Sequence, residues 1–188
     1  YIPYVTDILG AAVAFGAMLG VCRKFGSIGG NVVGGYLADK FGTARLMLVA
    51  FVAMLTGQIF LLFIPAKSSS IIIVSVLFVS ILVFFHMNYA MAWTMMSEGA
   101  VPVEYSGTAA GLICTAGAIP ETFVSILAGN IIDNHPGVMG YRYFFYFLTA
   151  VIAVGLVLIL IWRQYLKHAK IDKSKFDEKA MEDLKQYV

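Results

Sequence analysis

Long apolar runs, separated by short polar turns, make up most of the chain. Each complete run reaches about 20 residues or more, which is long enough for a helix to cross the roughly 30 Å hydrocarbon core of a bilayer. Turn residues such as Pro65, Pro136 and Gly137 lie between the runs. The pattern predicts an all-α fold, a polytopic bundle of transmembrane helices.

The run boundaries divide the chain into three parts. Residues 1–10 are read as the end of a preceding transmembrane helix and an outer turn. Residues 11–162 are predicted to form a five-helix bundle, with spans at about 11–38, 45–64, 71–96, 107–132 and 141–162. Residues 163–188 form a charged tail. The first span is about 42 Å long as a helix, so we expect it to tilt or to bend at its glycines.

Composition agrees with a membrane protein and argues against an enzyme. The 188 residues are 60% hydrophobic and 13% charged, about half the charged share of a soluble domain. Cys22 and Cys114 lie inside apolar runs and are read as reduced packing residues. No nucleophile–base set, metal-ligand spacing or phosphate-binding loop is present, so no catalysis, cofactor, metal or nucleic-acid partner is expected.

Basic residues are concentrated on one predicted side of the membrane. That side holds Lys40 and Arg45 of the first turn, and the tail adds further basic residues: Arg163, Lys167, Lys170, Lys173, Lys175, Lys179 and Lys185. The opposite side has only Lys67 and Arg142. The positive-inside bias places the tail and the first turn in the cytoplasm of a multi-pass protein of the cell membrane.

The first turn carries a recognisable set of residues, Gly35, Asp39, Lys40, Gly42 and Arg45. Glycines allow two helices to meet through a tight turn, and the charged side chains can tie the turn to its neighbours or to lipid headgroups. The set resembles the signature of the major facilitator superfamily. Thr43 and Ala44 depart from it, at positions where basic residues often occur.

The resemblance covers essentially the whole chain and implies a transporter. In that family the signature recurs between the eighth and ninth of twelve spans. The five spans therefore resemble the last five, which implies the C-terminal half of a twelve-helix fold and an N-terminal half as its partner. Residues 97–99 with 106–109, and residues 136–137 with 140–142, resemble the branch that transports organic and inorganic anions, the oxalate:formate and nitrate type.

Titratable residues lie near the centres of three spans, where charge is costly and usually functional. They are Arg23 and Lys24 in the first span, His86 in the third and Glu121 in the fourth. The second span offers only Gln58. These three spans correspond to cavity-lining spans of the resembled family, so we expect a central binding site for a small molecule among them.

Helical faces add detail to the first span. Glycines at 16, 20, 26, 30 and 34 fall on the side of Arg23. The bare face lets a ligand approach Arg23, packs closely against another helix, or does both along one long span, packed near its ends and open at its centre. Ser27, Asn31 and Lys24 flank it, and together with Arg23 they are candidate substrate-binding residues.

The third and fourth spans supply the remaining candidates. His86, Tyr89 and Trp93 recur at helical spacing, as a binding wall or as core packing, while Asn88 points elsewhere and is predicted to bond another helix. Glu121 follows Pro120, which should bend the fourth span. Its carboxylate is expected to pair with a cation of the first span, to bind a coupling proton or to hold structure.

The leading hypothesis is secondary active transport of a small anion, a carboxylate or an inorganic oxyanion, by alternating access. Arg23 would offer its planar fork to the anion. The first alternative is proton-coupled transport of a neutral or cationic solute, with Glu121 as the coupling site. The second, from another class, is a membrane scaffold or receptor that transports nothing, which would not need three charged span centres.

Overall fold

The computed structural model describes residues 1–98, 101 and 103–169, and every regular element within them is helical. The elements in chain order are a π-helical turn Tyr4–Ile8, α1 Val13–Phe41, α2 Thr43–Phe63, a 3-10 turn Ser68–Ser70, α3 Ile71–Glu98, a 3-10 turn Val103–Tyr105, α4 Ser106–Asn134 and α5 Val138–Ala169. The predicted all-α class is confirmed.

The helices follow the predicted spans with shifted ends. The helix predicted at 11–38 begins at Val13 and ends at Phe41. Its end lies further along the chain than predicted because the charged residues Asp39 and Lys40 are still helical. The last helix continues to Ala169, past the predicted start of the tail at residue 163. The rest of the tail, 170–188, lies outside the described residues, and the division into three parts stays a prediction.

Four helices of the described chain are long and apolar enough to cross a membrane: α2, the stretch from Ser68 through α3, α4 and α5. The fifth predicted span, α1, falls outside this group although it has 29 residues. Its centre carries Arg23 and Lys24, with Asn31 two turns further on, and these polar side chains lower its mean hydropathy. The same residues were singled out above as candidates for function.

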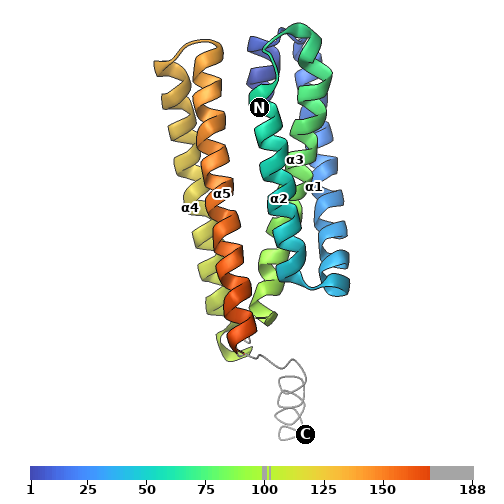
Figure 1. Cartoon of the computed structure of the whole chain (residues 1–188), viewed down its shortest axis with the longest axis vertical. Coiled ribbons are helices and arrows are strands. Elements are labelled where there is room, and N and C mark those ends of the chain that lie inside the picture. The colour runs from blue at the N-terminus through green and yellow to red at the C-terminus, as the bar shows by residue number, and fades with distance from the viewer. Residues whose placement is uncertain (99–100, 102, 170–188) are drawn as a thin grey trace, which may run out of the picture.

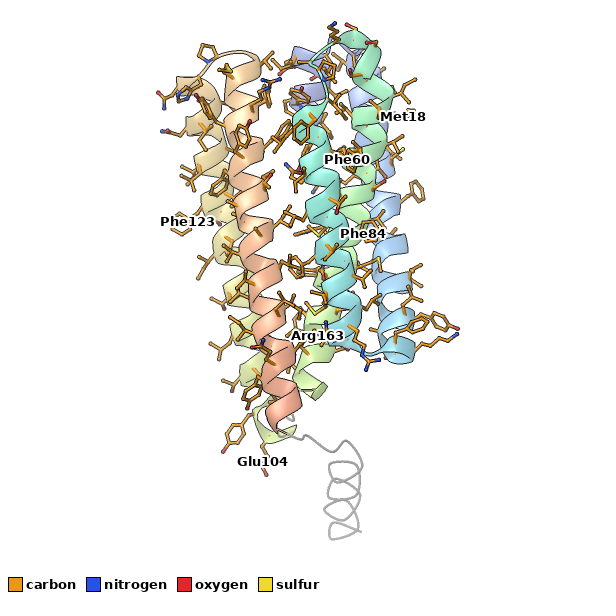
Figure 2. All side chains as sticks on the ribbon, viewed as in Figure 1. Met18, Phe60, Phe84, Glu104, Phe123 and Arg163 are labelled. Carbon is orange, nitrogen blue, oxygen red and sulfur yellow. The ribbon has the colours of Figure 1, made fainter. Side chains whose placement is uncertain are left out.

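The helices form a row of neighbours rather than a closed ring. Contacts run from α1 to α3, from α3 to α2, from α2 to α5 and from α5 to α4 (Figure 1). Apolar side chains project outward at both ends of the row, such as Met18 of α1 and Phe123 of α4 (Figure 2). An apolar exterior of this kind suits a bilayer.

A fully buried glutamine joins the N-terminal segment, α2 and α5. Gln58 accepts a hydrogen bond from the Tyr1 hydroxyl at 2.5 Å and donates its amide to the carbonyl oxygen of Phe145 at 3.4 Å. Aromatic rings surround the amide, and Tyr4 meets Phe145 edge-on at 5.1 Å. A buried amide is costly unless its polar atoms are satisfied, so Gln58 serves packing.

The glycine face of α1 packs against α3 from Gly26 to Gly34, while Gly16 meets Thr6 of the N-terminal segment. A Cβ added at Gly30 would lie 2.7 Å from the carbonyl oxygen of Val83, and one at Gly34 would lie 3.0 Å from the Cα of Met87. At Gly26 the nearest atom belongs to Val83, at 3.2 Å. Small residues let helix backbones approach closely in membranes. Close helix packing is therefore present along this face from Gly26 to Gly34.

This contact predicts opposite effects at two adjacent glycines. Gly30→Ala should lower the melting temperature of the purified protein, by an amount equivalent to about 1–3 kcal/mol, because its Cβ meets α3 backbone. Gly29→Ala is the matched control, since nothing lies within 4 Å of its added Cβ, and alanine favours a helix by up to about 1 kcal/mol over glycine. Equal melting temperatures for the two variants would contradict the packing role.

Candidate functional site

Ser27 of α1 and His86 of α3 meet at the level of the glycine contact. The Ser27 hydroxyl lies 3.2 Å from Nδ1 of His86, within hydrogen-bond distance. A Cβ added at Gly30 would also lie 3.3 Å from the Cβ of His86. The close approach of the two helices therefore brings together two residues that are 59 positions apart in the chain.

Two cations lie on α1 one turn before Ser27. Arg23 and Lys24 are both exposed, and the charges of both act on His86. Neither forms an ion pair with any described carboxylate. The site therefore combines two cations that have no partner among the described carboxylates with a hydroxyl and an imidazole, all of which can form hydrogen bonds.

Asn31 lies one turn beyond Ser27 on the same side of α1. Its side-chain oxygen is buried and accepts no hydrogen bond from the described residues. Buried polar atoms are normally satisfied by protein, water or ligand. Asn31 thus adds, next to the pair formed by Ser27 and His86, an amide oxygen that has no hydrogen-bond partner among the described residues.

Aromatic side chains continue the site along α3. Tyr89 is 55% exposed and Trp93 is 38% exposed, whereas Met87 and Met91 of the same helix are buried in the core. Neither ring is therefore fully buried among the described residues. Phe85, which the sequence analysis did not single out, contacts the His86 ring edge-on at 5.4 Å and is itself 49% exposed.

Asn88 points to the other side of α3, as predicted. It is buried, and its amide nitrogen lies 3.4 Å from the sulfur of Met54 on α2. This interhelical bond confirms the structural role expected for it. The helical period places Asn88 and His86 on different sides of α3, and this was enough to predict their different surroundings.

Glu121 lies in α4, directly after Pro120, and α4 is one continuous helix through both. The side chain of Glu121 is outside the part of the chain that is described. The main neighbour of α4 is α5, and none of the described residues in the most apolar stretch of α4 is buried. The pairing of Glu121 with Arg23 or Lys24 stays a prediction.

The motif residues form the turn between α1 and α2. Gly42 alone separates the helices, with φ at 85°, a conformation that favours glycine. Asp39, Lys40 and Arg45 are exposed around it. Thr43, the first residue of α2, is buried and lies 3.1 Å from the hydroxyl of Thr94 on α3. The turn is thereby tied to the helix that carries His86.

The chain matches one family model, that of the Major Facilitator Superfamily, over residues 1–187. The chain belongs to this superfamily. No curated protein and no solved structure matches it.

Membership gives the general function of the chain. Members of the superfamily are membrane transporters, and the apolar helices agree with a multi-pass membrane protein. The resemblance carried by the turn from Gly35 to Arg45 is thus confirmed at the level of the superfamily. Groups of three or more His, Cys, Asp or Glu residues that could hold a metal ion do not occur among the described residues.

Proposed function

We propose that this chain is the C-terminal half of a secondary active transporter for a small anion, a carboxylate or an inorganic oxyanion. The observation that supports it is the placement of Arg23 and Lys24 beside the hydrogen-bonded pair Ser27 and His86. The proposal assigns substrate binding to these four residues and to Asn31. Tyr89 and Trp93 belong to the wall of the same site.

Electrostatics favours an anion over a neutral or cationic solute. A charged side chain near the centre of a span is costly unless water or a counter-charge reaches it. Described carboxylates do not supply that counter-charge to Arg23 or Lys24. An anion would supply it, and the arginine fork matches the two oxygens of a carboxylate or the oxygens of an oxyanion.

Alternating access would move this half against an N-terminal half around the bound anion. In this proposal the turn of Gly35, Asp39, Lys40, Gly42 and Arg45 controls that movement, because it joins two helices through one residue. Glu121 would balance the charge of the site or carry a proton. The protein would lie in the cell membrane, with the turn and the tail on the cytoplasmic side.

The role of Arg23 can be tested with one conservative substitution. We expect Arg23→Lys to weaken anion binding by tenfold or more, about 1.4 kcal/mol, because lysine keeps the charge and loses the fork. The full-length transporter is titrated calorimetrically with acetate, benzoate, nitrate and sulfate, and the tightest binder is used. Arg142→Lys, an exposed arginine at the start of α5, is the matched control.

The melting temperature of the unliganded variant separates binding from structure. Arg23 is exposed, so Arg23→Lys should melt within about 2 °C of the wild type, the shift expected from well under 1 kcal/mol. A clear loss of stability with unchanged affinity would mean that Arg23 is structural. The anion proposal would then fail.

The role of the turn predicts a defect in transport without a defect in folding. Asp39→Asn should reduce flux of the bound anion into proteoliposomes at least fivefold, because the substitution removes the charge and keeps the shape. The amount of folded protein should be unchanged, since Asp39 is exposed. Glu104→Gln, at the same end of the bundle (Figure 2), is the control, and an equal loss of flux in both variants would contradict a specific role for Asp39.

The proposed orientation predicts a labelling pattern in intact cells. In a background without native cysteines, Ser69→Cys should react with an impermeant thiol reagent, whereas Phe41→Cys should react only after permeabilisation. Both positions are exposed and lie at opposite ends of α2. Thr43 is unsuitable because it is buried. The reverse pattern would place the turn outside the cell.

A further inference from the structure

The side of the α1–α3 pair where Ser27 meets His86 combines two kinds of chemistry; we name it the His86 flank. On α1, Arg23, Ser27 and Asn31 follow one another at intervals of four residues and form a narrow polar strip. On α3, Trp93 lies about 20° around the helix from His86, and Tyr89 lies about 60° from it. Tyr89 and Trp93 form what we call the aromatic strip. Because Ser27 lies within hydrogen-bond distance of His86, the polar strip of α1 lies next to the aromatic strip of α3.

The rings of the aromatic strip have no partner within the described chain. Trp162 stacks on Tyr165 and Tyr1 stacks on Phe145, but neither Tyr89 nor Trp93 contacts another described ring. The neighbouring cations do not cover them either, since the cation–ring contact in the described residues joins Lys40 to its own neighbour in the turn. Tyr89, at 55% exposed, and Trp93, at 38%, therefore keep accessible ring surface near two cations that form no ion pair with a described carboxylate.

The spacing of the strip fits a molecule of one ring. Along α3, Tyr89 lies about 4.5 Å beyond His86 and Trp93 lies about 10.5 Å beyond it, at a rise of 1.5 Å per residue. A carboxylate held at the level of Ser27 and His86 would place an attached six-membered ring beside Tyr89, with its far edge toward Trp93. Aromatic rings prefer such offset or edge-on contacts.

We propose that the anion bound at the His86 flank is an aromatic carboxylate. Its carboxylate group binds at Arg23, Ser27 and His86, and its ring packs against Tyr89 and Trp93. This inference rests on the proposed function and narrows it from small anions in general to planar, amphipathic monocarboxylates.

Compact anions fit this surface less well. Nitrate or sulfate would satisfy Arg23 and Ser27 but would leave both open rings in contact with water or lipid. An aliphatic acid would cover the apolar surface of Tyr89 and Trp93 but could not make offset or edge-on contacts between aromatic rings. Ligand sites typically combine a mostly apolar wall with a few placed polar groups, and the His86 flank has that division between its two helices.

The test is an affinity ranking on the full-length transporter in detergent. Benzoate, cyclohexanecarboxylate, acetate and nitrate, all ionised at neutral pH, are titrated calorimetrically at one ionic strength. Benzoate is expected to bind at least tenfold more tightly than acetate or nitrate, and more tightly than cyclohexanecarboxylate, which has similar size and equal charge but no planar ring.

Two variants test whether Tyr89 and Trp93 cause the preference for benzoate over acetate. Trp93→Leu and, separately, Tyr89→Leu should weaken benzoate binding at least fivefold and leave acetate binding within twofold of the wild type. Phe25→Leu is the matched control: Phe25 is 71% exposed and lies on the opposite side of α1 from Ser27. It should change no affinity.

Each outcome separates this inference from the proposed function. Equal affinities for benzoate and acetate, or equal weakening of both by Trp93→Leu, would overturn the aromatic preference and leave anion binding intact. A loss in Phe25→Leu as large as that in Trp93→Leu would show a general effect of apolar surface and would also overturn it. Binding of none of the four anions would overturn the proposed function itself.

Discussion

The contact between the backbones of α1 and α3 at Gly30 is the constraint on which the candidate site depends. Only a residue without a Cβ allows the Val83 carbonyl to lie so near. That distance brings the short side chain of Ser27 within hydrogen-bond reach of His86. A larger residue at Gly30 would separate the helices, and a serine hydroxyl is too short to span the added gap. The contact at Gly30 thus both packs α1 against α3 and places Ser27 within hydrogen-bond distance of His86.

The same contact explains why α1 can be the least apolar of the long helices. An isolated helix with Arg23, Lys24 and Asn31 near its middle would pay a high free-energy cost in lipid. Along α3 it has glycine-mediated van der Waals contact instead, and its polar strip faces the side where His86 lies. The low hydropathy of α1 comes from this polar strip, while its other side carries exposed apolar residues such as Met18, Phe25 and Ile28.

Some of this arrangement followed from the sequence and some did not. Apolar runs located all five helices, and the helical period separated Asn88 from His86, because these depend on local spacing. The glycine face of α1 had two interpretations, since a bare surface serves a ligand or a helix equally well until the neighbour is known. Gln58 was seen as a lone polar residue, but its partners Tyr1 and Phe145 are brought to it by tertiary packing. Phe85 was missed because it is the chain neighbour of His86 and falls outside the helical spacing that links His86, Tyr89 and Trp93.

The uneven packing of the bundle suggests where conformational freedom lies. A helix that makes few contacts can move at a low free-energy cost. The main neighbour of α4 is α5, and none of the described residues in the apolar stretch of α4 is buried. The α1–α3 pair is different, because a shift there would break backbone-level contact at Gly30 and Gly34. The Ser27–His86 pair therefore sits on the rigid part of the bundle. A shift of α4 relative to this pair would therefore break fewer contacts within the described chain than a shift of α1 against α3.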